Sequence, residues 1–65
     1  MVRNKIKEYR EAKHMSQGAL ALKCGLGQST VSEIEAGKHE PTIGVALLLA
    51  RALGVAVGAI FELKE

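Results

Sequence analysis

Residues 16–37 read SQGALALKCGLGQSTVSEIEAG, and this stretch decides the fold. Ser16 is a typical helix N-cap, and apolar residues then recur on one helical face until Gly25 interrupts the pattern. The glycines that flank Leu26 are both free to adopt positive φ, which predicts a tight corner with one apolar side chain as an inward plug. A second helix is expected over 28–36, ended by the glycine that follows.

The sequence outside this stretch predicts three further helices. They are expected over 5–13 with Asn4 as N-cap, from the N-cap Thr42 to Leu53, and around Val57, Ile60 and Phe61. No repeat, linker or low-complexity tract divides the chain, so one domain over 1–65 accounts for it. The predicted fold class is all-α, a compact five-helix domain.

Composition limits both the core and the compartment. The only aromatic residues are Tyr9 and Phe61, so the interior must be built from Leu, Ile, Val and Ala. The single cysteine, Cys24, excludes an intramolecular disulfide and is typical of a reducing, cytoplasmic setting; we expect it to be a packed core thiol. The longest apolar run, 45–50, is far too short to cross a bilayer, so we expect a soluble protein without membrane contact.

No pattern in the sequence predicts catalysis. Cysteine and histidine do not cluster as metal ligands, and neither a nucleophile–base pair nor a phosphate-binding loop is recognisable. We expect no enzyme activity, no metal, no cofactor and no small-molecule ligand.

Charge is distributed unevenly along the chain. Residues 1–38 carry seven Lys and Arg against four Glu, which is net +3, whereas residues 39–65 carry two basic residues against three Glu, which is net −1. A basic surface that faces phosphates and an ordinary solvated surface both fit this asymmetry.

The helix over 28–36 has two unlike faces. On a helical wheel, Val31 and Ile34 lie on one side. The opposite side carries short polar side chains: Gln28, Ser29, Ser32 and Glu33. Amides and hydroxyls can pair with base edges in a major groove, and small side chains let a helix lie deep in it. A solvated helix face is the alternative, but such faces usually contain Lys or Arg, and this one has neither.

The spacing of these residues resembles the phage-repressor and Cro (XRE) family of helix-turn-helix regulators. The segments that carry the resemblance are 15–17, 20–21, 25–38, 41–42 and 50–55, so it covers nearly the whole chain. The resemblance implies a lambda-repressor-like domain with its helix-turn-helix at about 16–36. It also implies a sequence-specific, double-stranded DNA-binding transcriptional regulator, either a repressor or a controller protein.

The resemblance also implies roles for individual residues. Base contacts would come from Gln28, Ser29, Ser32 and Glu33, and phosphate contacts from Gln17, Thr30, Lys38 and His39. In the family the residue at Gln17 also supports the one at Gln28, and backbone amides around Gly37 help to hold phosphate. Glu33 would either accept a hydrogen bond from cytosine or hold a neighbouring side chain in place. Arg10 and Glu35 match a structural ion pair that orients the recognition helix.

Two positions depart from the family pattern. Ala36 stands where an asparagine often donates to phosphate, which removes one expected contact. Gly27 stands where the third helix usually has a serine or threonine cap, and glycine is a slightly weaker cap.

The last two predicted helices carry apolar residues at positions that are usually polar in the family. These are Gly44, Val45, Leu48, Gly58 and Ala59. Exposed apolar patches on small domains mark contacts with other chains. We therefore expect a homodimer joined through Val45, Leu48 and Ala59, on a palindromic operator with half-sites about 34 Å apart. A compact monomer is the alternative for the assembly, and a protein-interaction module, such as the antitoxin of a toxin–antitoxin pair, is the alternative for the function.

Overall fold

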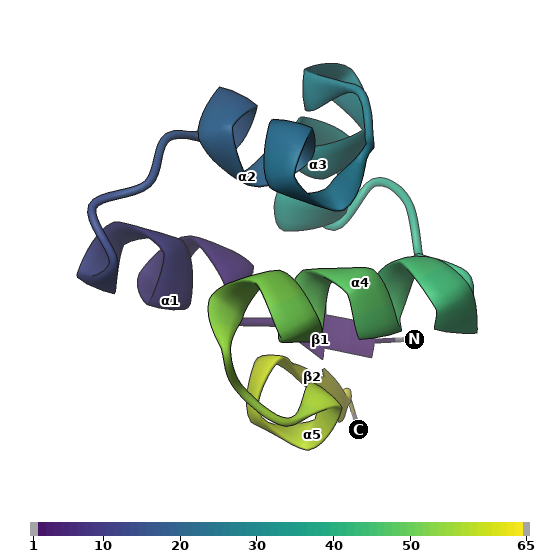
Figure 1. Ribbon diagram of the computed structural model, residues 1–65. Helices are drawn as coiled ribbons and strands as arrows, with labels where there is room; N and C mark the ends of the chain where they lie inside the picture. The colour runs from purple at the N-terminus through teal and green to yellow at the C-terminus, as the bar shows by residue number, and fades with distance from the viewer. Residues whose placement is uncertain (1, 65) are drawn as a thin grey trace.

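The computed structural model describes residues 2–64, and the five predicted helices are present in it (Figure 1). Their bounds are α1 Ile6–Ala12, α2 Gln17–Cys24, α3 Gln28–Glu35, α4 Ile43–Leu53 and α5 Val57–Ile60. Two short strands, β1 Val2–Asn4 and β2 Phe61–Leu63, flank the helices in the sequence. None of the helices in this part of the chain combines the length and apolarity that a membrane span requires.

The helix ends follow the capping signals of the sequence. The hydroxyls of Ser16 and Thr42 accept hydrogen bonds from backbone amides three residues later, at 3.0 and 3.3 Å. Gly25 and Gly54 end α2 and α4 in the left-handed conformation, both with φ of 70°. Gly27 does not share this conformation: its φ is −74°, because it is the extended N-cap of α3. The corner between α2 and α3 therefore uses positive φ at only one of the two glycines that are free to adopt it, and Gly27 is the expected cap of α3.

The expectation of an all-α fold is wrong at the two ends of the chain. β1 and β2 pair as antiparallel strands, with Val2 opposite Leu63 and Asn4 opposite Phe61. Phe61 thus belongs to β2, whereas we expected it in the fifth helix. Strands of three residues are too short to show a period of two, and each finds its partner about 60 residues away in the sequence, so no local pattern announces them.

Asn4 also differs from its expected role as the N-cap of α1. It lies in β1, and Lys5 is the N-cap residue, without a side-chain capping bond. The Asn4 Oδ1 atom instead accepts a hydrogen bond from the backbone amide of Ile6 at 3.2 Å. The side chain still satisfies one amide of the first helical turn, but it does so from one residue further out.

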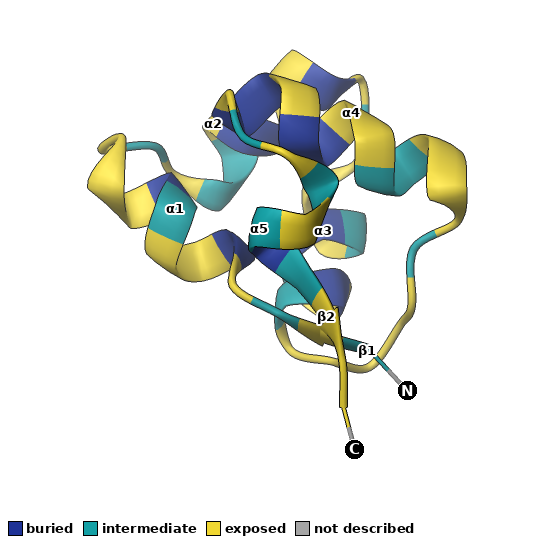
Figure 2. Ribbon diagram, turned by 90° about the horizontal axis from the view of Figure 1, so that it is seen from below, coloured by how far each residue is buried: buried dark blue, intermediate teal, exposed yellow. Residues whose placement is uncertain are grey.

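The core is one cluster of aliphatic residues that all five helices share (Figure 2). Its buried members are Ile6, Leu20, Ala21, Cys24, Val31, Ile34, Leu49, Ala50, Ala52, Leu53 and Ile60. Leu26, the expected plug, is half-buried and packs against this cluster. α2 and α3 pack side by side above α4 in Figure 1, with α5 and β2 below it. This packing fixes the inner face of α3 and leaves its other face outward.

Candidate nucleic-acid interface

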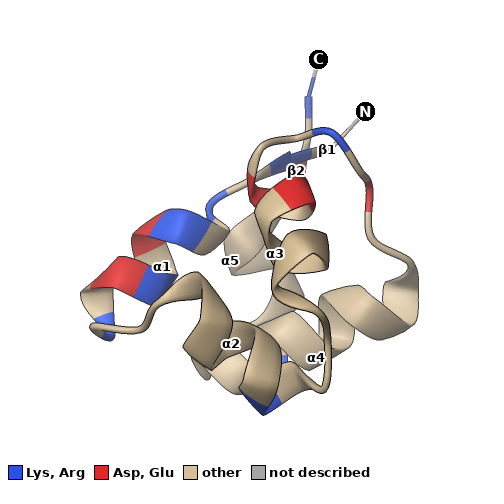
Figure 3. Ribbon diagram, turned by 90° about the horizontal axis from the view of Figure 1, so that it is seen from above, with Lys and Arg blue, Asp and Glu red and all other residues tan. Residues whose placement is uncertain are grey.

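The outward face of α3 consists of the short polar side chains that the sequence predicts. Val31 and Ile34 point inward and are 0% and 1% exposed. Gln28, Ser29 and Glu33 are exposed, and Ser32 is half-buried. The first turns of α2 and α3 carry no charged side chain, and they are drawn in tan in Figure 3. The face can offer hydroxyls and amides to a partner.

The C-terminal end of α3 is held by a buried ion pair. The Arg10 guanidinium donates from Nε to Glu35 Oε2 at 2.8 Å and from Nη2 to Glu35 Oε1 at 3.1 Å. Its Nη1 donates to the Met15 carbonyl at 2.8 Å. The side chains of Arg10 and Glu35 are only 10% and 6% exposed. Two parallel hydrogen bonds fix direction as well as distance, so α1 holds the last residue of α3 in one orientation.

Arg10 carries its positive charge within this ion pair. Its hydrogen bond with Glu35 raises the pKa of Arg10 above the ordinary value, although burial of the guanidinium opposes that rise. The raised pKa keeps the guanidinium protonated and available to Glu35.

Gln17 belongs to the same network. Its Nε2 atom donates to Glu35 Oε1 at 3.2 Å, so the amide turns toward the ion pair. The resemblance implies a Gln17 that supports Gln28; in this structure the Gln17 amide bonds to Glu35, and the Gln28 amide lies beside Gly18. A Cβ atom on Gly18 would lie 3.2 Å from Gln28 Oε1. The sequence does not predict the contact between Gly18 and Gln28, because glycine has no side chain whose type would indicate it.

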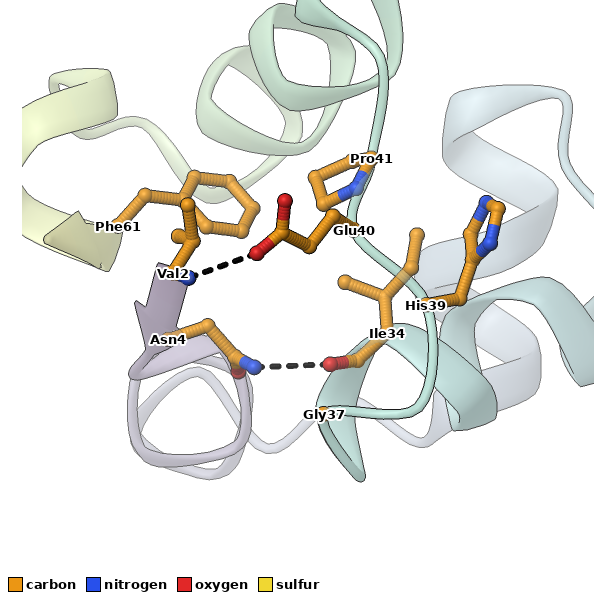
Figure 4. A pocket seen from close by; sticks show the side chains of 8 residues that line it. All are labelled: Val2, Asn4, Ile34, Gly37, His39, Glu40, Pro41 and Phe61. Carbon is orange, nitrogen blue, oxygen red and sulfur yellow. Dashed lines mark hydrogen bonds between the residues drawn. The ribbon is translucent and has the colours of Figure 1, made fainter. Parts of the chain in front are cut away.

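Strand β1 holds the same end of α3 from the other side (Figure 4). The Asn4 Nδ2 atom donates to the Ile34 carbonyl at 2.8 Å, and the Val2 amide donates to Glu40 Oε1 at 2.8 Å. Asn4 therefore adds a second donor to one of the last carbonyls of α3, which also accepts from the backbone amide of Gly37. Sequence reasoning missed both contacts, because they join residues 30 and 38 positions apart.

The turn after α3 uses its own backbone amides. Gly37 has a φ of 76°. Its amide donates to the Ile34 carbonyl at 3.1 Å, and the Lys38 amide donates to the Glu33 carbonyl at 3.0 Å. Both amides are therefore occupied within the protein, contrary to the expectation that they hold phosphate. The side chains of Lys38 and His39 are exposed.

An open hollow of about 360 Å³ lies between α1, the start of α2 and the end of α3. It is lined by Lys7, Arg10, Gln17, Ser32, Glu35 and Ala36. Lys7 is exposed and brings a cation beside two of the predicted contact residues. Sequence reasoning did not single out Lys7, although its spacing of three from Arg10 indicates the same face of α1.

The expected interface residues of the last two helices are only partly outward. Val45 and Ala59 are half-buried, and Val45 packs against the core, whereas Leu48 is 37% exposed. Ile43 and Leu47 project furthest from α4, at 82% and 56% exposure. They are four residues apart and share one face of the helix. The apolar surface exists, but it is centred closer to the start of α4 than the sequence indicates.

Comparison with known proteins gives consistent matches. The helix-turn-helix family model matches residues 6–60. An uncharacterized HTH-type transcriptional regulator of Methanocaldococcus jannaschii is 37% identical over 64 residues, which cover 98% of this chain and 97% of the relative. The restriction-modification controller protein C.AhdI from Aeromonas hydrophila is 36% identical with a TM-score of 0.78, over 80% of this chain and 79% of that one.

A DNA-binding domain of known structure is also similar to this chain. The N-terminal DNA-binding domain of SinR from Bacillus subtilis is 34% identical with a TM-score of 0.78, over 83% of this chain and 80% of that one. The matched family region contains α1 to α5, and with them the polar face of α3 and the ion pair that holds its end. The chain belongs to the helix-turn-helix family of DNA-binding transcriptional regulators.

Proposed function

We propose that this protein is a sequence-specific, double-stranded DNA-binding transcriptional regulator that inserts α3 into the major groove. One observation carries the proposal: α3 buries Val31 and Ile34 and turns a compact, short-chained polar face outward. A helix of this shape fits the major groove, where amides and hydroxyls meet base edges. The similarity to HTH-type transcriptional regulators and to a DNA-binding domain supports it, and the comparisons give no support to an antitoxin-like interaction module.

Within this docking, the residues of α3 read bases. Gln28 and Ser29 lie in the first turn, and Ser32 and Glu33 follow one turn later on the same side. Gln28 is suited to a bidentate contact with adenine, and Glu33 is suited to accept from cytosine N4. A bidentate contact discriminates against the wrong base by about 1–3 kcal/mol.

The phosphate contacts surround this face. The Gln17 amide uses one hydrogen for Glu35 and has a second for a phosphate oxygen. The Thr30 hydroxyl and the side chains of Lys38 and His39 complete the expected set. We add Lys7, because it lies in the hollow beside Gln17. Phosphate contacts of this kind set register and affinity but not sequence.

The protein acts as a non-catalytic homodimer on a palindromic operator. Support comes from the apolar surface of α4, where Ile43, Leu47 and Leu48 are exposed on the same helix. Val45 and Ala59 would border this contact. Two copies related by a two-fold axis present two α3 helices to half-sites about 34 Å apart. We assign the regulator to the cytoplasm, with Cys24 as a reduced thiol and without a cofactor.

A controller or repressor role fits this architecture. The similarity to a restriction-modification controller protein extends over 80% of the chain. Occupancy of the operator would then depend on the concentration of the protein and on dimer formation.

The test of sequence reading is selection of bound duplexes from a random DNA pool. Gln28→Ala should relax the preference at one base position and leave the others, whereas Gln17→Ala should weaken all duplexes alike. Identical consensus and unchanged affinity for both variants would refute this docking face.

The test of the dimer is sedimentation equilibrium at micromolar concentration. The wild-type chain should sediment as a dimer, and Leu47→Lys should sediment as a monomer, because a charge would be buried in the contact. Glu62→Lys makes the control substitution on exposed β2 and should remain dimeric. A monomeric wild type at these concentrations contradicts the dimer.

A further inference from the structure

The backbone conformation at position 18 does not require a glycine. Gly18 is the second residue of α2, and it is absent from the glycines with positive φ, which are Gly25, Gly37 and Gly54. Alanine is the better helix former, so glycine here has a conformational cost. What it provides is space on the surface of α2.

The Gln28 side chain occupies that space. A Cβ atom on Gly18 would lie 3.2 Å from Gln28 Oε1 and 3.8 Å from Gln28 Cδ, and the next nearest atom would be Ser16 Oγ at 3.9 Å. The first of these distances is too short for a relaxed contact, so an added methyl group would force the amide to move by a few tenths of an ångström. Because Gln28 is exposed, it can move at little cost to the fold.

We propose that Gly18 is a specificity-determining position: it forms the recess that sets where the Gln28 amide lies when α3 meets a base. Gln17, which the resemblance implies as the support of Gln28, donates its amide to Glu35. A bidentate contact needs the oxygen and nitrogen of the amide in position together, so a shifted amide loses discrimination even though the residue that reads the base is unchanged. The inference rests on the proposed function, because it assumes that Gln28 reads DNA.

The variant that tests this is Gly18→Ala, and the chain contains a matched control. Gly44 is the second residue of α4, as Gly18 is of α2, and each stands two residues after a hydroxyl N-cap residue. A Cβ atom on Gly44 would meet nothing within 4 Å. Both substitutions add the same methyl group at the same helical position, so both should raise Tm, by up to about 4–8 °C. Only Gly18→Ala should affect Gln28.

The measurement is competition binding of the full-length variants to a set of four duplexes. The duplexes differ only in the base at the position where Gln28→Ala loses its preference. A bidentate contact corresponds to about 5- to 150-fold discrimination, and Gly18→Ala should reduce it at least about threefold. Gly44→Ala should keep it, because Gly44 borders the proposed dimer contact on α4, and a change there alters the affinity for every duplex alike. The double variant Gly18→Ala/Gln28→Ala should lose no more discrimination than Gln28→Ala alone, because both substitutions act through the Gln28 side chain.

Failure of this inference differs from failure of the proposed function. Wild-type discrimination in Gly18→Ala, with the preference lost in Gln28→Ala, overturns the role of Gly18 and leaves the function standing. An equal loss of affinity for every duplex in Gly18→Ala also overturns it, because the methyl group would then block the phosphate backbone. An unchanged preference in Gln28→Ala overturns the proposed reading of bases itself.

Discussion

The two ends of α3 differ in how firmly other parts of the protein hold them. The C-terminal end is fixed by side chains from three other elements: Arg10 of α1, Gln17 of α2 and Asn4 of β1. The N-terminal end begins at Gly27, which gives no side-chain capping bond, and its first residue, Gln28, is exposed beside a glycine. One end of the helix is anchored and the other presents adaptable side chains.

This difference explains how a short helix can both orient and read. α3 has eight residues, too few to be stable without tertiary contacts. Anchoring one end through hydrogen bonds fixes the direction of the helix, and burial of its apolar side fixes its rotation. The free end can then vary in sequence without loss of the fold. Substitutions at the anchored end should affect stability, and substitutions at the free end should affect DNA preference.

Glu35→Ala should give the largest effect on stability. It leaves the Arg10 guanidinium buried without its partner, which costs about 3–5 kcal/mol in the free energy of unfolding. Urea unfolding followed by circular dichroism measures it, and loss of the cooperative transition is the extreme form of the same result.

The exposed ion pair between Arg3 and Glu62 is the natural control for Glu35→Ala. Its charges are 3.7 Å apart, and the side chains are 57% and 47% exposed. Glu62→Ala should cost at most about 0.5 kcal/mol. Equal costs for Glu35→Ala and Glu62→Ala would contradict the anchoring of α3.

Asn4→Ala should destabilise the protein by about 1–2 kcal/mol, since the Ile34 carbonyl loses one of its two donors and the Ile6 amide loses its acceptor. Asn4→Asp keeps an acceptor for the Ile6 amide but still removes that donor, so it separates the two hydrogen bonds. Thermal unfolding should show both variants below wild type. An unchanged Tm in Asn4→Asp would mean that the bond to α3 contributes nothing.

Lys7→Gln and Lys38→Gln should each reduce the salt dependence of DNA binding without changing the consensus. Each phosphate contact contributes about −0.9 to the slope of log affinity against log salt concentration. Each variant should therefore make this slope less steep by about one. Lys23→Gln is the control, since Lys23 lines a surface with Leu48 and Arg51 on another part of the molecule. A slope that falls equally in all three variants would show non-specific attraction.

The reactivity of the Cys24 thiol distinguishes substitutions at the anchored end of α3 from those at its free end. Burial raises the pKa of the Cys24 thiol, and the Sγ atom donates to the Leu48 carbonyl at 3.6 Å. The folded thiol therefore stays neutral as pH rises, while the unfolded thiol ionises first, so this group makes stability fall with increasing pH above about 8.5. Alkylation at pH 8 should require opening of the fold. Asn4→Ala should accelerate it about 5- to 30-fold, and Gln28→Ala should leave the rate unchanged.

The sequence predicts the helix-turn-helix well because its signals are local. Ser16 caps α2 and Gly25 ends it, each through atoms within one helical turn. The resemblance likewise identifies Arg10 and Glu35, since both residue types are needed for the pair that forms. These features depend on residue identity and spacing, which are visible in the chain itself.

The features that the sequence does not predict depend on contacts across the fold. β1 and β2 pair from opposite ends of the chain, and Asn4 reaches α3 only because that pairing brings it there. The resemblance assigns Gln17 a position but not a side-chain orientation, and here its amide turns toward Glu35. Val45 could not be recognised as part of the packed surface, because apolar residues occur on both faces of α4.

The claim that α3 reads DNA is tested most directly by an NMR titration of the isotope-labelled protein with its selected duplex. We expect the largest amide shift changes in the first turns of α2 and α3 and around Lys38, with little change along the Ile43 and Leu47 side of α4. Changes centred on that apolar side of α4, with Gln28 and Ser29 unaffected, would contradict the claim that α3 reads DNA.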